Sequence, residues 1–323
     1  MLAEKIEDIL AGKLRKPKGI EFYEKYHGKF RESGVHKGKT ALNQIKSLSS
    51  VPELKRLAYV SVGGSEGSEI EYILKNSDIQ HGFLLEFDSY ACQIANKRKE
   101  GLPDGETLQV IHGNVVEKLP MMQKLLHDLR AKGEIDGVFI VANAIFHELP
   151  YRGKGFGLNS FLKELFWDWD PCIFLSREPC KPFNWPEKVE ISIDGISSDL
   201  LFRFSHEIKR RLSLDGDIVR SGPHFVTMGS HLATEAIHKL FYIDDFDYEI
   251  QECLTCLDPD EFMRNIEDVF GKNSVFQVRL NSSSFSRKYQ EHNITVKTLN
   301  GTLLSMPLSF VSVVGSRIKK NLV

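Results

Sequence analysis

The hydrophobic pattern is most regular between Leu57 and Glu178, where short apolar runs alternate with amphipathic stretches. Apolar runs rich in β-branched residues predict buried strands. The stretches between them carry apolar residues three and four positions apart, which predicts helices. Strands alternating with helices predict a parallel sheet with helices on both faces. The five predicted strands are Leu57–Val62, Gly82–Leu85, one within Leu108–Pro120, one within Ile135–Leu149, and Pro171–Glu178.

The flanking segments have different patterns. Apolar residues at Leu2, Ile6, Ile9 and Leu10 predict a short helix, and two further helices are expected over Ile20–Phe30 and Thr40–Leu48. We therefore expect residues 1–50 to form a helical cap and 51–180 the sheet, followed by a stretch of different character over 181–257, which would be an insertion if the chain has the fold of the family that it resembles below. The helices predicted after the sheet are Leu200–Leu212, Gly229–Tyr242 and Asp258–Phe270, the last followed by strands Ser274–Leu280 and Leu308–Val314.

A glycine-rich turn follows the first predicted strand. Gly63, Gly64 and Gly67 allow close approach of a ligand to the backbone and positive φ angles. Ser65 and Ser68 are N-cap candidates for the next helix. Strand, glycine turn, helix, strand and acid form the layout of a nucleotide-binding βαβ unit. The acid, Glu86, is placed to accept hydrogen bonds from ribose hydroxyls.

Polar residues follow several of the predicted strands. They are Ser61–Gly67, Glu86, Asn114 and Asn143–His147. Ligands of open parallel sheets bind outside the carboxyl ends of the strands. These residues are therefore expected to form one site.

The turn sequence GGSEG fits the dinucleotide pattern G-x-G-x-x-G poorly. It resembles the first motif of class I S-adenosylmethionine-dependent methyltransferases, an acid-x-G-x-G-x-G pattern. Gly63 and Gly67 match its first and last glycines, Ser65 replaces the middle glycine, and Ser61 replaces the leading acid. Further matches to the family follow in order across Leu54–Glu178, and they read LLEFDSYACQIANKR, LQVIHGNVVEKLP, IDGVFIVANAIFHEL and PCIFLSRE.

The resemblance implies a Rossmann-like α/β fold, with a mostly parallel sheet, an antiparallel terminal strand, and an insertion before the last helix. Segment 258–323 would supply that helix and a terminal β-hairpin. The cofactor would be S-adenosylmethionine. The residues that would bind it are Ser61, Gly63, Gly64, Ser65, Gly67, Glu86, Phe87, Asn114, Val115 and Asn143.

Methyl transfer from a sulfonium is an in-line displacement that depends mainly on proximity and alignment. A base is needed mostly when the acceptor is a hydroxyl or a protonated amine. His147 and Glu148, after the fourth predicted strand, are the catalytic candidates, and a loop-orienting role is the alternative. The candidate substrate-binding residues are Tyr23, Tyr26, Arg177 and His224, and for the tyrosines core packing is the alternative.

The favoured activity is methylation of a hydroxyl or amine on a small molecule. The N-terminal region has more Lys and Arg than Asp and Glu, which leaves an RNA or protein substrate as an alternative. The sequence NAIFHEL replaces the Asn/Asp-Pro-Pro-aromatic motif, which argues against methylation of DNA base amino groups. A non-catalytic binding or regulatory protein is the third hypothesis, motivated by Ser61, Ser65 and Asn114.

Composition adds limits. A net charge of −2 over 323 residues gives no general attraction to nucleic acid or membrane. Five cysteines suggest a reducing, cytoplasmic location, and neither a membrane span nor a signal peptide is predicted. Cys253-Leu-Thr-Cys256 has zinc-motif spacing, but a zinc site needs two more ligands and the sequence has no second pair. His231, Glu235 and His238 share a helical face, but this pattern alone is too common to indicate zinc, so no metal is expected. The oligomeric state stays open.

Overall fold

The computed structural model describes residues 2–13, 19–48, 56–103, 107–148, 158–166, 169–255, 257–280, 283–307 and 310–317. Within these ranges the side chains of residues 19–27, 29–30, 148, 248, 273, 278–280, 283–286 and 310 are not described. The chain divides into two compact units. The sheet unit comprises Lys18–Glu178, Asp260–Val278 and Ser312–Val323, and the second unit Met1–Pro17, Pro179–Pro259 and Arg279–Val311.

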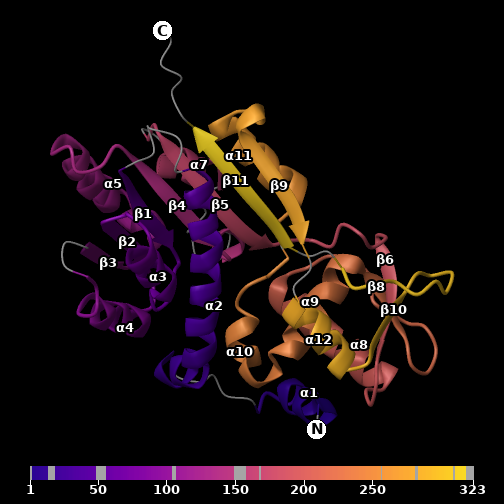
Figure 1. The fold of residues 1–323 in the computed structure, drawn as a ribbon. Helices are drawn as coiled ribbons and strands as arrows, with labels where there is room; N and C mark the ends of the chain where they lie inside the picture. Colours follow the sequence, from indigo (N-terminus) through magenta and orange to yellow (C-terminus); the bar gives the residue numbers. More distant parts are fainter. Residues whose placement is uncertain are drawn as a thin grey trace. The chain divides into compact units, whose positions relative to one another are not determined.

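The sheet unit is built on a seven-stranded sheet with the order β3-β2-β1-β4-β5-β11-β9 (Figure 1). Its first five strands alternate with helices, as the hydrophobic pattern predicts. The strands are β1 (Leu57–Val62), β2 (His81–Glu86), β3 (Thr107–His112), β4 (Gly137–Asn143), β5 (Cys172–Pro179), β9 (Val275–Leu280) and β11 (Phe310–Arg317). The helices are α2 (Gly19–Leu48), α3 (Ser68–Asn76), α4 (Ser89–Lys99), α5 (Val115–Ala131), η2 (Phe146–Glu148), α7 (Leu158–Phe166), α11 (Pro259–Phe270) and η4 (Lys272–Ser274).

Strands β1 to β5 pair in parallel, so their carboxyl ends share one edge of the sheet. Val62 is level with Leu85 of β2 and with Ala142 of β4. The next residues along, Glu86 and Asn143, are therefore at one level. The register thus confirms that the polar residues following these strands share one edge.

The terminal strands complete the Rossmann-like α/β sheet expected from the resemblance. β11 lies between β5 and β9, and Figure 1 shows β9 and β11 running in opposite directions. The connection between them is not a tight turn, because it carries α12 (Ser283–Glu291) and β10 (Ile294–Lys297). The sequence did not predict these two elements.

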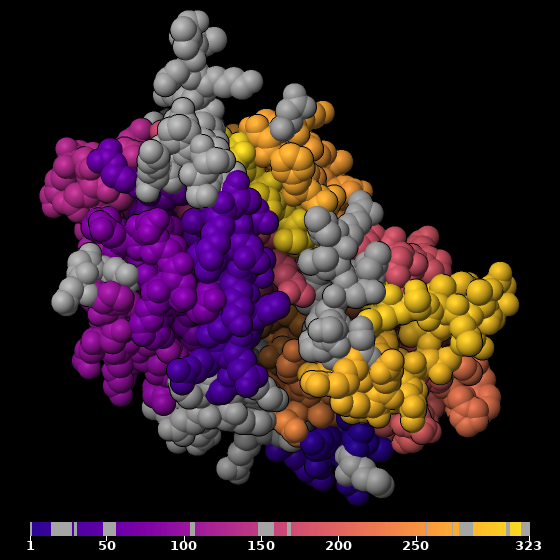
Figure 2. Space-filling model, viewed as in Figure 1, coloured from indigo at the N-terminus to yellow at the C-terminus, as the bar shows by residue number. Residues whose placement is uncertain are grey.

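Helix α2 is one continuous helix where the sequence predicted two with a break between them. It packs against α3 at two glycines. A Cβ on Gly34 would lie 2.7 Å from the Cβ of Ser68, and a Cβ on Gly38 would lie 3.0 Å from that of Tyr72. Figure 2 shows α2 in indigo at the surface of this unit. Glycines that usually weaken a helix are here the positions of close helix packing.

Two predicted helix starts are wrong. Helix α3 has Gly67, at φ 77°, in the N-cap position with no side-chain cap, so neither Ser65 nor Ser68 caps it. The sequence predicts a helix over Leu119–Lys132 with Pro120 at its start, but α5 begins at Val115, which leaves Pro120 inside the helix. Asn114 caps α5 by accepting a hydrogen bond from the backbone N–H of Val116, and this cap extends the helix by a turn.

The second unit holds a four-stranded sheet with the order β10-β6-β8-β7, which the sequence did not predict. Its buried core includes Ile191, Leu201, Phe204 and Ile237. Among the described residues no helix is long and apolar enough to cross a membrane. Besides α12 and β10, the elements of the second unit are α1 (Leu2–Leu10), β6 (Lys188–Ile193), α8 (Ser198–Leu212), β7 (Val219–Arg220), β8 (Val226–Gly229), α9 (Ser230–Phe241), η3 (Ile243–Asp245) and α10 (Phe246–Glu249).

The division of the chain into four segments, with boundaries at 50, 180 and 257, stays a prediction. In the structure α1 groups with the second unit and α2 with the sheet unit. Helices α1 and α2, which cover the expected N-terminal cap, therefore belong to different units.

Candidate functional site

The loop between β1 and α3 has the backbone conformation that a glycine-rich turn permits. Gly63, Ser65 and Gly67 have φ angles of 65°, 52° and 77°, in the left-handed region. Ser65 adopts this conformation with a side chain, which costs of order 1 kcal/mol. At Gly64 a Cβ would lie 2.3 Å from the Ser61 Oγ, so only glycine fits there without movement. The loop backbone therefore combines left-handed φ angles with a position, Gly64, that has no room for a side chain.

Glu86 is bonded directly to this loop. Its Oε2 accepts the backbone N–H of Ser65 at 2.8 Å, and its Oε1 accepts that of Asp88 at 2.9 Å. Burial raises the pKa of the Glu86 carboxyl, while these backbone hydrogen bonds act in the opposite direction. Each oxygen has a second lone pair that can accept another donor. The carboxylate is thus fixed in orientation and still able to bind hydroxyl groups.

Arg98 of α4 is hydrogen-bonded to Glu66 of the same loop, an interaction that the sequence did not predict. Its guanidinium donates to the Glu66 carbonyl at 2.8 Å, to the Glu66 carboxylate at 2.6 Å and to Glu71 at 2.6 Å. The Glu66 side chain is 1% exposed. The sequence carries only a weak signal for this pair, because Arg98 belongs to a run of basic residues that reads as a solvated helix end.

Ser61, predicted to contact the cofactor, is buried and hydrogen-bonded inside the protein. Its hydroxyl donates to Glu69 Oε1 at 3.3 Å, and the Tyr59 hydroxyl donates to the same oxygen at 2.7 Å. Burial, followed by the charge of Glu69, raises the pKa of Tyr59 well above its usual value. The Glu69 carboxylate of α3 is thus hydrogen-bonded to Ser61, the residue at the position where the family motif has its leading acid.

Asn114, Val115 and Phe87 follow the ends of β3 and β2. The Asn114 side chain caps α5 through the Val116 N–H at 3.0 Å, and Val115 is the first residue of that helix. Phe87 is 62% exposed, an unusual state for a large apolar ring. The ring nitrogen Nε2 of His112 lies 3.0 Å from the Phe87 carbonyl oxygen. The three predicted cofactor residues therefore all lie at the edge that carries Glu86.

His147 and Glu178 form a buried pair. Nδ1 of His147 lies 3.1 Å from Oε2 of Glu178, and the two side chains are 3% and 0% exposed. Glu178 Oε1 accepts the backbone N–H of Ile145 at 2.9 Å. The carboxylate can thus orient the imidazole. The side chain of Glu148 lies outside the described residues.

The candidate substrate residues are distributed over the chain. Arg177 is level with Asn143 in the parallel pairing of β5 and β4, and burial lowers the pKa of its guanidinium. Tyr23 and Tyr26 lie in α2, but their side chains are outside the described residues. His224 is exposed and belongs to the second unit. The strand register therefore brings Arg177 to the edge with Asn143.

Comparison with known proteins gives fold-level likeness only. No family model matches the sequence, and no curated protein matches it. Among solved structures, the plantazolicin methyltransferase BpumL in complex with SAH is 11% identical at a TM-score of 0.45, over 98% of this chain and 94% of that chain. The methyltransferase domain of bacterial CtHen1-C is 12% identical at a TM-score of 0.40, over 88% of this chain and all of that one.

The pyocyanin biosynthetic protein PhzM is 10% identical at a TM-score of 0.35, over 84% of this chain and 54% of that chain. Likenesses this distant carry no argument about chemistry. The sheet order and the contacts of its edge residues therefore carry the functional argument. They define a Rossmann-like α/β fold with a polar site outside the carboxyl ends of its parallel strands.

Proposed function

We propose that this protein is an S-adenosylmethionine-dependent methyltransferase. The observation that carries the proposal is the contact between Glu86 and the glycine loop. Two backbone N–H groups hold the carboxylate, and one of them belongs to the left-handed Ser65. The remaining lone pairs of Glu86 would accept the two ribose hydroxyls, and Gly63 to Gly67 would approach the methionine part of the donor.

The other donor contacts follow from the position of each residue at the strand edge. The exposed ring of Phe87 would cover the adenine, and burial of an aromatic face supplies affinity. Asn114 and Val115 would bind the adenine edge at the start of α5. The Asn114 carbonyl oxygen, which accepts the Val116 N–H, would accept the adenine amino group with its second lone pair. Asn143 would contact the methionine end.

The chemistry proposed is displacement at the methyl carbon. The bond between the acceptor atom and carbon forms as the carbon–sulfur bond breaks, and the electron pair of that bond stays on sulfur. An acceptor hydroxyl or ammonium must also lose a proton, and His147, oriented by Glu178, is the proposed base. Glu148 is the second candidate for this role. The remaining rate enhancement comes from holding acceptor and methyl group in line.

A small-molecule hydroxyl or amine is the proposed acceptor. Arg177, beside Asn143 at the sheet edge, would bind an anionic or carbonyl group of it. Tyr23, Tyr26 and His224 are retained as further proposed substrate residues. An RNA or protein acceptor is the alternative, and binding of RNA would weaken steeply with salt.

Two observations favour a second candidate, a non-catalytic binding or regulatory protein. Ser65 has φ 52° where the family motif has glycine, and the Ser61 hydroxyl donates a hydrogen bond to Glu69. The glycine loop, which is hydrogen-bonded to Glu86, would then have only a structural role. This candidate predicts no turnover with any acceptor.

Calorimetric titration with S-adenosylmethionine and S-adenosylhomocysteine separates these functions. We expect both to bind to the wild-type protein, and Glu86→Ala to remove binding while the fold is kept. Glu100→Ala, which removes an exposed glutamate at the end of α4, is the matched control and is expected to bind normally. Binding that survives Glu86→Ala, or wild-type protein that binds neither compound, contradicts the proposal.

A further inference from the structure

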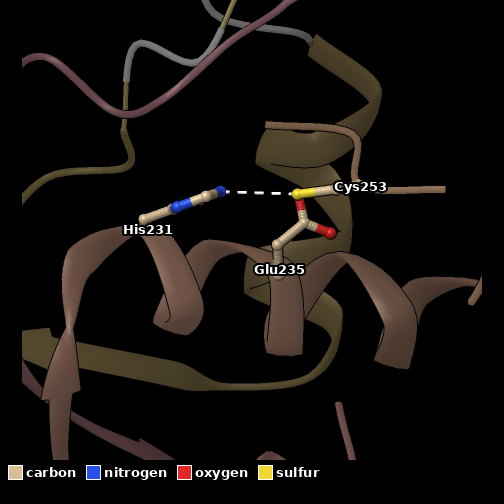
Figure 3. A group of neighbouring side chains, drawn as sticks. All are labelled: His231, Glu235 and Cys253. Atoms are coloured by element: carbon tan, nitrogen blue, oxygen red, sulfur yellow. Dashed lines mark hydrogen bonds between the residues drawn. The ribbon is translucent and has the colours of Figure 1, made fainter. Parts of the chain in front are cut away.

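Three side chains of different chemistry meet inside the second unit. His231 and Glu235 lie one turn apart on α9, and Cys253 comes from the segment after α10 (Figure 3). The Cys253 Sγ lies 3.4 Å from the His231 Nε2 and 3.4 Å from the Glu235 Oε1. One donor atom from each of the three residues lies within 4.8 Å of the others. The side chains therefore point toward a common centre.

The two separations from the Cys253 sulfur match those of ligands on one metal ion. A tetrahedral Zn²⁺ holds sulfur at about 2.3 Å and nitrogen or oxygen at about 2.0–2.1 Å, which places two such donors roughly 3.5 Å apart. Both sulfur contacts measured here are 3.4 Å. The His231 nitrogen and the Glu235 oxygen, which lie within 4.8 Å of each other, would move closer together as the ion binds. We propose that His231, Glu235 and Cys253 form a zinc-binding site.

The donor set suits zinc, because an imidazole nitrogen, a carboxylate oxygen and a cysteine sulfur are all common zinc ligands. A thiolate from Cys253, formed as the metal binds, would complete a set of two negative ligands and one neutral ligand.

The carboxylate is also held in place by its neighbours, as metal ligands usually are. Glu235 Oε1 accepts hydrogen bonds from the backbone N–H of Thr255 at 2.6 Å and from its hydroxyl at 2.5 Å. The Lys239 ammonium lies 3.6 Å from Glu235 Oε2. Thr255 is thus a positioning residue, and Oε1 faces the thiol from a fixed orientation.

The geometry leaves one coordination position for water or another donor. Glu235 and Cys253 are fully buried, whereas His231 is only partly buried and gives the site an edge toward solvent. An ion can enter along this edge. Cys256, which shares a C-x-x-C spacing with Cys253, lies outside the described residues, and the proposal does not use it.

A metal-free alternative explains the same contacts by hydrogen bonds. The imidazole N–H would donate to sulfur, and the thiol would donate to the carboxylate. The Glu235–Lys239 ion pair would then serve only stability. Metal content, together with the spectrum of bound cobalt, separates the two explanations.

The first experiment measures zinc in the full chain purified without chelators, and then replaces the zinc with Co²⁺. We expect one zinc per chain and a cobalt protein with a near-ultraviolet sulfur-to-cobalt charge-transfer band. Cys253→Ser should abolish that band, and His231→Ala should lower cobalt affinity at least tenfold. The controls are Cys92→Ser in the sheet unit and His224→Ala, an exposed histidine of the second unit, and both should keep the band.

Two measurements remain informative if the ligand variants fold poorly. Thr255→Val keeps the backbone bond to Glu235 and removes the hydroxyl bond, which should weaken cobalt binding about 10-fold. Because Cys253 is fully buried, its alkylation is measured in mild denaturant, where bound zinc should protect the thiol and removal of zinc should abolish that protection. Absence of any charge-transfer band, zinc content unchanged in folded Cys253→Ser, or protection of a different cysteine overturns the proposal.

Discussion

The carboxylate of Glu86 accepts the backbone N–H of Ser65 at 2.8 Å and so joins the end of β2 to the glycine loop after β1. The two residues are 21 positions apart in sequence. The bond fixes an acceptor group beside a backbone turn in the left-handed region. Four measurable consequences follow from this site and its supports.

The proposed donor binding should depend on pH through Glu86. Burial raises the pKa of its carboxyl above the usual 4.5, so protonation begins at a higher pH than for an exposed glutamate. A protonated carboxyl loses acceptor capacity toward ribose hydroxyls. Affinity for S-adenosylhomocysteine should therefore be full at neutral pH and fall as pH decreases toward and through this raised pKa. Calorimetry across that range checks the fall, which Glu86→Gln should flatten.

Removal of Arg98 should destabilise the sheet unit and its loop together. Arg98→Met removes the guanidinium that is paired with the buried Glu66 carboxylate, and breaking a buried ion pair in this way costs about 3–5 kcal/mol. Urea unfolding measures the loss. Lys97→Met, which removes an exposed cation from the same helix, should change stability by less than about 0.5 kcal/mol. Equal stability of the two variants would contradict the assigned role of Arg98.

Helix α2 offers a matched pair of glycine substitutions. A Cβ on Gly28 would meet nothing within 4 Å, so Gly28→Ala should stabilise the protein by up to about 1 kcal/mol through helix propensity. Gly34→Ala would place a Cβ 2.7 Å from that of Ser68, and the overpacking should cost about 1–3 kcal/mol. Thermal unfolding compares the two directly. Stabilisation by both changes would show that α2 does not pack closely on α3.

The proposed base should affect turnover without affecting the donor. Once an acceptor is found, His147→Asn should lower kcat by about 10²–10⁴-fold, the usual contribution of general-base catalysis. The affinity for S-adenosylhomocysteine should stay unchanged, because no donor contact is assigned to His147. His36→Asn, an exposed histidine of α2, is the control and should keep full kcat. A parallel loss of donor affinity in His147→Asn would assign the residue to structure instead.

Local signals in the sequence were sufficient for the parallel sheet and the edge residues. The six-residue run Leu57–Val62 is buried throughout, as its apolar pattern predicts. Glu86 and Asn143 end β2 and β4, so their location follows once the strands are identified as parallel. These inferences hold because buried parallel strands require continuous apolar runs, and because parallel strands end at one edge.

Contacts between residues far apart in the sequence could not be predicted from such local signals. The sequence predicted separate helices over Ile20–Phe30 and Thr40–Leu48, but α2 is continuous, and its packing against α3 at Gly34 and Gly38 offsets the low helix propensity of glycine. The Arg98–Glu66 pair spans 32 residues, and neither motif analysed for metal contains both Glu235 and Cys253. The sequence by itself determined which segments become strands and helices, because hydrophobic period is a local property. Only the tertiary structure decided which polar side chains meet, since that depends on how the helices and loops pack.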